Sequence, residues 1–181
     1  MRILTLVLSI ISFVDSYSQK LAPVKIGEDI SIKIPISFVN MSNQDRMARV
    51  ASSKVPLGMF STESQEVTLG INDNIMQWKP EDTKVVYGFY KASINALFDE
   101  IQFIQDTIKQ INGREFVVFE FVSTIRDENV FSSKSGERNY TYIQYTSYKD
   151  QVLLFNFGAP ARLQLEWEDI AKEVMQSVKI K

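Results

Sequence analysis

Residues 101–121 read IQFIQDTIKQINGREFVVFEF, and the dipeptide Asn112-Gly113 in their middle organises the rest of the chain. Asn-Gly between two runs of β-forming residues is typical of a β-hairpin with a type I′ turn. In such a hairpin Ile111 faces Arg114, and the residue numbers of every further cross-strand pair also sum to 225. One face then holds Ile104, Asp106, Ile108, Val117, Phe119 and Phe121, and the other holds Phe103, Thr107, Ile111, Phe116, Val118 and Val122.

Both faces of this predicted hairpin are largely apolar. An antiparallel strand pair with two apolar faces must be covered on both sides, because either face would otherwise expose apolar surface to water. We therefore expect the hairpin at the centre of a sheet. The predicted fold class is α+β, an α/β/α sandwich whose central antiparallel sheet is covered by helices on both faces.

Three carboxylates lie in this stretch, at Asp106, Glu115 and Glu120. The predicted register sets Asp106 opposite Phe119 and Glu120 opposite Gln105, so these two acids fall on opposite faces of the sheet. A glycosidase-type pair needs its carboxyl groups about 5–9.5 Å apart across one bond. We therefore predict no catalytic pair here, and we expect each acid to lie toward a strand end or to meet a donor from a loop or helix.

The segments before this hairpin supply further elements. Alternating apolar residues predict a half-buried strand over residues 30–38, with Pro35 at a sheet edge or with its N–H side facing outward. Ser42 is the predicted N-cap of a short helix. Short strands are expected at about 57–61 and 66–72.

Two longer helices and a second hairpin complete the prediction. Pro80, followed by two acids, predicts a helix start, and the apolar spacing extends this helix to about Asp99. Residues 138–148 and 151–158 predict a hairpin that turns at Lys149-Asp150-Gln151 and ends at Pro160. The predicted inner residues are Val86, Phe89, Tyr90, Ile94, Leu97 and Phe98 in the first helix, and Trp167, Ile170, Ala171, Val174 and Val178 in the closing helix.

The N-terminus has the pattern of a cleaved secretory signal. Arg2 precedes a short apolar run, and small residues follow at Ser16 and Ser18, so we predict cleavage near Ser18. An uncleaved N-terminal anchor is the alternative. No transmembrane span is expected in the mature chain. The predicted organisation is a signal peptide over residues 1–18, a loose N-terminal segment over 19–29 and one domain over 30–181, in a protein that is exported to a periplasm or secreted.

The composition excludes several classes of chemistry. The chain has 181 residues and contains no His and no Cys, so a Ser-His-Asp triad, a Cys-His pair and a His- or Cys-ligated zinc are impossible. It also lacks Ser-x-x-Lys and the nucleotide-binding glycine motifs. We predict no enzyme, no catalytic residue, no cofactor and no metal site, with carboxylate-only chemistry left open. With 20 basic and 22 acidic residues and no basic stripe, no nucleic acid is expected as a partner.

Aromatic residues supply the candidate binding surface. Tyr140, Tyr142 and Tyr148 fall on one face of the second predicted hairpin, and Tyr145 falls on the other. Aromatic side chains often anchor protein interfaces, but Tyr also suits ordinary strand packing. Trp78, just before the predicted helix start, marks either a groove or a buried boundary. The predicted surface is therefore Tyr140, Tyr142, Tyr148 and Trp78.

The order of the predicted elements resembles that of the Mog1/PsbP-like superfamily. The residues that carry the resemblance are ISIKIPISF (30–38), INGREFVVFEF (111–121), YIQYTSYKDQVLLFNF (142–157) and WEDIAKEVMQSVKI (167–180), within about residues 27–181. The resemblance implies an α/β/α sandwich and a binding or accessory role, and it transfers no catalytic residue. The secretory leader favours the exported bacterial members over the nuclear Ran-binding branch.

The sequence therefore predicts an exported, non-enzymatic binding or accessory protein of the cell envelope, whose partner is another envelope or secreted protein. Two alternatives stay open. A carrier or chaperone for a small apolar ligand or segment requires an internal apolar cavity. A carboxylate-based hydrolase requires two acids that converge in a cleft, and the candidates in predicted loops are Glu63, Glu66, Asp73, Glu81 and Asp82.

Overall fold

The computed structural model describes residues 19–49, 54–74, 76–125 and 136–181. Within these residues the strands form two antiparallel sheets, a large sheet of seven strands in the order β3-β4-β5-β9-β8-β7-β6 and a small sheet of three in the order β1-β2-β10. The elements are β1 (Leu21–Ile26), β2 (Ile30–Pro35), β3 (Val39–Asn40), α1 (Asn43–Arg49), β4 (Gly58–Ser61), β5 (Thr68–Asn74), η1 (Pro80–Asp82), α2 (Thr83–Leu97), β6 (Glu100–Ile111), β7 (Arg114–Ile125), β8 (Glu137–Tyr148), β9 (Gln151–Pro160), η2 (Ala161–Leu163), α3 (Gln164–Gln176) and β10 (Lys179–Ile180).

Strands β6 and β7 form the hairpin predicted around the Asn-Gly turn. Asn112 and Gly113 have φ of 50° and 84°, the positive values that a type I′ turn requires. Ile111 pairs with Arg114, and the predicted register is confirmed back to Gln105, which pairs with Glu120. The turn residues therefore set the register at this end of the hairpin.

A register shift at Ile104 changes the pairing beyond that point. Phe103 pairs with Phe121, where the uninterrupted register predicted Val122. One extra residue inverts the alternation, so the predicted placement of Phe103 beside Phe116 and Val118 is wrong. Its ring instead lies 6.2 Å from that of Phe119 and 5.8 Å from that of Phe121, measured between centroids.

Strands β8 and β9 form the second predicted hairpin. Lys149 and Asp150 have φ of 50° and 57° and make its two-residue turn between Tyr148 and Gln151. Strand β9 ends at Pro160, as predicted. On its other side β9 pairs with β5, and β4 and β3 follow outward.

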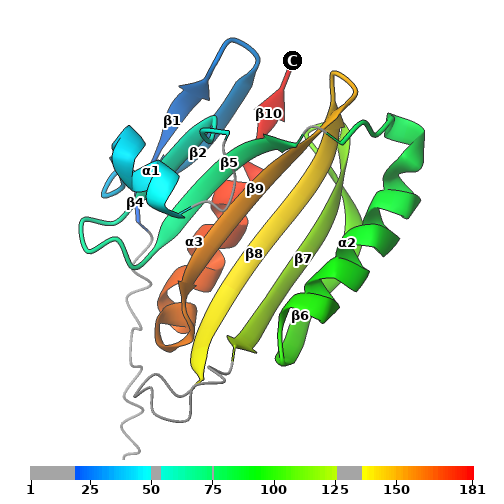
Figure 1. Cartoon of the computed structure of the whole chain (residues 1–181). Helices are drawn as coiled ribbons and strands as arrows, with labels where there is room; N and C mark the ends of the chain where they lie inside the picture. The colour runs from blue at the N-terminus through cyan, green and yellow to red at the C-terminus, as the bar shows by residue number, and fades with distance from the viewer. Residues whose placement is uncertain (1–18, 50–53, 75, 126–135) are drawn as a thin grey trace, which may run out of the picture.

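Helices α2 and α3 cover opposite faces of the large sheet, which we call the α2 face and the α3 face (Figure 1). This arrangement confirms the predicted α+β sandwich. The core on the α2 face contains Val86, Ile94, Val117, Phe119, Phe121, Ile143, Tyr145 and Val152. The core on the α3 face is larger, because strand β2 of the small sheet adds apolar side chains to it, and it includes Ile30, Ile32, Ile34, Phe116, Val118, Phe157, Trp167, Ile170 and Val174.

The N-terminal part of the domain differs from the prediction. Residues 19–29 were expected to be loose, but Leu21–Ile26 forms β1 and pairs with β2 along its whole length. The segment LAPVKI is short and contains Pro23, so its own pattern is weak, and pairing with the strongly alternating β2 makes it a strand. Strand β2 ends at Pro35, before the predicted limit at Phe38.

Both predicted helix starts are confirmed. The backbone N–H of Asp45 donates to the hydroxyl of Ser42 at 3.2 Å, so Ser42 caps α1. Pro80 begins the turn η1 that leads into α2, and the Asp82 carboxylate accepts from the backbone N–H of Lys79 at 3.1 Å. The predicted signal peptide and the polar segment 126–135 lie outside the described residues.

Candidate functional site

The two sheet carboxylates lie apart, as predicted, and each meets a lysine from a covering helix. Asp106 forms an ion pair with Lys91 of α2, and this hydrogen bond raises the pKa of Lys91. Glu120 is 1% exposed on the α3 face, where the Tyr140 hydroxyl donates to it at 3.0 Å and Lys172 lies 3.6 Å away. The two acids therefore hold the helices against the sheet and share no cleft.

Glu120 is the centre of a buried polar cluster under α3. Burial raises the pKa of Glu120, although the hydrogen bond from Tyr140 and the charge of Lys172 act in the opposite direction. Lys172 also donates to Glu168 at 2.5 Å, and this bond lowers the pKa of Glu168. These contacts satisfy the buried carboxyl group of Glu120, as a structural role requires.

Three of the five predicted loop acids are held by contacts of their own. Glu66 pairs with Arg162, Asp73 accepts from Lys54 at 2.6 Å, and Asp82 caps η1. In the part of the chain that the structure describes, no group of three or more acidic side chains could hold a metal ion. The geometry therefore gives no support to the hydrolase alternative.

The predicted tyrosine surface is corrected by burial. Tyr140 and Tyr142 share a face with Tyr148, as predicted, but both are 0% exposed under α3 and cannot contact a partner. The prediction that these tyrosines share a face is correct, but α3 covers that face. A Tyr ring buries as much apolar area in a core as at an interface, so its presence on a strand does not tell the two roles apart. Tyr148 and Trp78 are half-buried, so their part of the predicted surface stays a prediction.

Helix α2 exposes apolar residues on the side away from the sheet. Val85, Phe89, Ala92 and Ala96 are exposed and follow one another at three- and four-residue spacing, and we call them the outer stripe of α2. Val85 is 57% and Phe89 42% exposed. The sequence from Thr83 to Leu97 contains no acidic residue. Apolar residues therefore lie on the side of this helix away from the sheet as well as on the side that packs on the sheet.

The sequence placed Phe89 and Leu97 on the buried side of α2, and this prediction is wrong. Tyr87 and Lys91 turn toward the sheet instead: the Tyr87 ring stacks on Phe119 at 5.5 Å, and Lys91 reaches Asp106. Leu97, at the end of the helix, is 69% exposed. Phe89 lies three residues after Val86 and four residues after Val85, so apolar spacing alone did not show which of these residues face the sheet.

Strand β6 lies beside α2 and forms one edge of the large sheet, so the prediction that the β6–β7 hairpin lies at the centre of the sheet is wrong, although both faces of the hairpin are covered. Strand β6 is 12 residues long and pairs with β7 on one side only in the described residues. Ile104, at the register shift, is 41% exposed. A long edge strand offers unpaired backbone groups to another chain, and a bulge is one device that limits such pairing. The outer stripe of α2 and this edge form the candidate protein-binding surface.

Comparison with known proteins finds no matching protein-family model and no matching curated protein. Solved structures do match. Cyanobacterial PsbP (CyanoP) from Synechocystis sp. PCC 6803 has a TM-score of 0.59 at 11% identity, over 89% of this chain and 92% of that one. The Ran-binding protein Mog1p of Saccharomyces cerevisiae has a TM-score of 0.57 at 10% identity, over 90% and 96%. LpqN, involved in cell envelope biogenesis of Mycobacterium tuberculosis, has a TM-score of 0.56 at 13% identity, over 90% of this chain and 91% of that one.

The chain has the Mog1/PsbP-like fold. The resemblance predicted from the order of elements is thereby confirmed for the fold. The similarity covers nearly the whole described chain at sequence identities that carry no residue roles. No helix formed by the described residues has both the length and the apolar character needed to cross a membrane.

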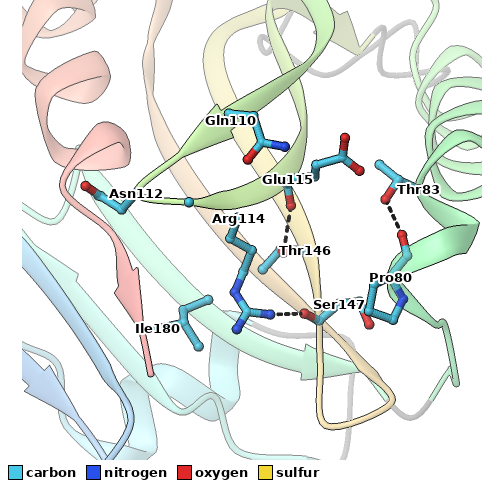
Figure 2. Close-up of a pocket in the computed structure, with 10 residues that line it drawn as sticks. Pro80, Thr83, Gln110, Asn112, Arg114, Glu115, Thr146, Ser147 and Ile180 are labelled. Carbon is cyan, nitrogen blue, oxygen red and sulfur yellow. Dashed lines mark hydrogen bonds between the residues drawn. The ribbon is translucent and has the colours of Figure 1, made fainter.

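A hollow of about 320 Å³ opens at the turn end of this Mog1/PsbP-like sheet (Figure 2). Its lining is mostly polar and includes Thr83, Gln110, Asn112, Arg114, Glu115 and Thr146. Figure 2 shows the Arg114 guanidinium turned toward Ser147 and the Glu115 carboxyl group turned toward Thr83. An apolar ligand needs a mainly apolar wall, so this hollow does not fit the carrier alternative.

Proposed function

We propose that this protein is an exported, non-enzymatic accessory protein of the cell envelope that binds another protein through α2 and the edge strand β6. The observation that carries the proposal is the exposed outer stripe of α2. Large apolar side chains clustered on one side of a surface helix are typical of interaction sites, because they leave water when a partner covers them.

The stripe has the shape that a protein partner needs. Val85 and Phe89 are its large side chains. The Phe89 ring packs against two neighbouring rings, with centroid distances of 5.2 Å to Tyr90 and 6.1 Å to Trp78. Ala92 and Ala96 leave room for a partner's backbone to approach the helix closely. An aromatic anchor held by its neighbours loses little side-chain entropy on binding, which favours it as an interface residue.

The proposal that this protein is exported rests on residues 1–18 and on one protein of the same fold. The leader has the charged start, apolar run and small residues of a secretory signal. LpqN, which shares the fold, is involved in cell envelope biogenesis in its own organism. An envelope location would place the partner among envelope or secreted proteins.

Native mass spectrometry of the mature protein, purified gently from its own host, tests the proposal. The variant Val85→Glu/Ala92→Glu adds two charges to the outer stripe, and Leu165→Glu on α3 is the matched control, because Leu165 is 97% exposed. We expect a discrete added protein mass with the wild type and the control. Burial of unpaired charge should weaken that complex at least about tenfold in the stripe variant.

Two results would contradict the proposal. An added protein mass that survives equally in all three proteins would place the interface elsewhere. A small discrete mass of ligand size, unaffected by the stripe variant, would favour the carrier reading instead.

A further inference from the structure

A second hollow, of about 270 Å³, adjoins the one in Figure 2 and shares Pro80, Arg114 and Ser147 with it. Its charged lining consists of three cations, Arg114, Lys149 and Lys181, and one acid, Asp150. The whole sequence has 22 acidic and 20 basic residues. Asp29, which does not line the hollow, is ion-paired with Lys149 at 2.8 Å, so Arg114 and Lys181 are the cations of this lining that form no ion pair among the described residues.

Three separate parts of the chain bring these cations together. Arg114 follows the Asn112-Gly113 turn, and the side-chain amide of Asn112 donates to the carbonyl groups of Gln176 (3.0 Å) and Val178 (2.8 Å), which fixes the C-terminal segment beside the turn. Lys149 lies in the turn of the second hairpin. The hollow is thus built by residues at two hairpin turns, by Pro80 and by the residue after β10, and no single segment forms it.

Arg114 has unused hydrogen-bonding capacity. One of its terminal nitrogens donates to the carbonyl oxygen of Ser147 at 2.8 Å, which orients the guanidinium. Among the described residues no carboxylate forms an ion pair with Arg114. A guanidinium has five N–H donors in a planar fork that matches the oxygens of a carboxylate or a phosphate.

Lys149 is held at the wall of the hollow. Its ammonium group donates to Asp29 at 2.8 Å and lies 4.9 Å from the centre of the Tyr148 ring. The hydrogen bond to Asp29 raises the pKa of Lys149, so the group stays charged. Asp29 uses one of its three N–H donors and Tyr148 also contacts the group, so at least one donor is left for a ligand.

We propose that this hollow binds the oxyanion group of a small solute, a phosphate or a carboxylate, with Arg114 as the main ligand and Lys149 and Lys181 as supporting charges. Arg114 would make the paired hydrogen bonds, Lys149 would add a hydrogen-bond donor, and Lys181 would add a positive charge. Asp150 opposes binding through its negative charge, while the planar fork of Arg114 favours groups that it can bind in its plane.

The test is an NMR titration of the isotope-labelled protein with inorganic phosphate and, separately, with succinate. We expect saturable shifts of the amide signals around Gly113 and Lys149, in the millimolar range, for at least one of the two solutes. Arg114→Gln should weaken that binding about tenfold, because it removes a charge-assisted pair of hydrogen bonds. Asp150→Asn should strengthen it about twofold to fivefold by removing the opposing charge.

Lys109→Gln is the matched control. It changes the net charge as Arg114→Gln does, but Lys109 hydrogen-bonds Gln105 and does not line the hollow. Binding by this variant should stay within about twofold of the wild type. Arg114→Lys keeps the charge without the planar fork and should show intermediate affinity, which tests the site even if Arg114→Gln fails to fold.

The proposal is overturned if neither solute gives saturable shifts. It is also overturned if Lys109→Gln weakens binding as much as Arg114→Gln does, since the effect would then be one of net charge alone. If phosphate binds and succinate does not, the ligand carries a phosphate, and the reverse result assigns a carboxylate.

Discussion

Helices α2 and α3 cover the same sheet from opposite sides, but they differ in how much of each helix is buried. Five residues of α3 are buried, among them Trp167, Ile170 and Val174, whereas Val86 and Ile94 are the buried residues of α2. The exposed residues of α3 include Glu166, Asp169 and Glu173, while the outer stripe of α2 has no acid. Both helices are amphipathic, but α2 carries additional apolar residues on its exposed side.

This difference separates residues that folding uses from residues that it does not. In α3 the apolar residues account for the core, since the Trp167 ring lies 5.6 Å from Phe38 and 6.1 Å from Phe157. In α2 the apolar residues exceed what the sheet can bury. The exposed apolar residues of α2, which do not pack on the sheet, are the basis for assigning this helix a binding role.

The largest expected effect is on the α3 side. Trp167→Ala should lower the free energy of unfolding by about 3–5 kcal/mol, because it opens a cavity between Phe38 and Phe157. Phe89→Ala, on the exposed side of α2, should cost about 1 kcal/mol or less. Urea unfolding of both variants measures the two values, and equal losses would contradict the contrast between the helices.

The next effect concerns the polar cluster under α3. Glu120→Ala should lower stability at pH 5 by about 1–3 kcal/mol, because the buried Tyr140 hydroxyl then loses its acceptor. Glu120→Gln keeps an acceptor oxygen and should lose less at the same pH. The same unfolding experiment compares the two variants, and an identical loss would show that the hydrogen bond contributes nothing.

A smaller effect depends on pH. Because burial raises the pKa of Glu120 above its ordinary value of 4.5, the folded state favours the neutral acid. The stability that this proton contributes is present below pH 4.5 and is lost as the pH rises through the folded-state pKa. The wild type should therefore lose stability relative to Glu120→Gln between pH 4 and pH 7, and a constant difference in thermal unfolding across this range would contradict the assignment.

The smallest expected effect is on the outer stripe itself. Val85→Glu/Ala92→Glu should change the free energy of unfolding by less than about 1 kcal/mol, because both side chains are exposed and contribute little to the core. Thermal unfolding measures this change beside Leu165→Glu. A loss comparable to that of Trp167→Ala would mean that the stripe serves folding.

Local sequence signals predicted the β6–β7 hairpin and its register near the turn, but not its place at the edge of the sheet. The Asn112-Gly113 turn set the hairpin register, and it correctly placed Asp106 and Glu120 on opposite faces. The register shift at Ile104 has no such signal, because no glycine or proline marks it. Strand β1 was missed for a related reason, since it owes its structure to pairing with β2.

The candidate sites were harder to predict than the fold. Alternation assigned Tyr140 and Tyr142 to one face of a strand, but it could not say that α3 buries that face. The outer stripe of α2 depends on the rotation of a helix, which Tyr87 and Lys91 set through contacts far away in the sequence. The hollow lined by Arg114, Lys149 and Lys181 uses residues that are far apart in the sequence, so only the folded chain forms it.

Photo-cross-linking in the native host tests the role of α2 most directly. A photoreactive phenylalanine analogue replaces Phe89 in one protein and Leu165 of α3 in the other, so that the exposed sides of the two helices are compared. We expect one discrete protein adduct from position 89, lost when Val85→Glu/Ala92→Glu is added, and no such adduct from position 165. Equal adducts from both positions, or an adduct from position 165 alone, would contradict the proposal that α2 carries the binding surface.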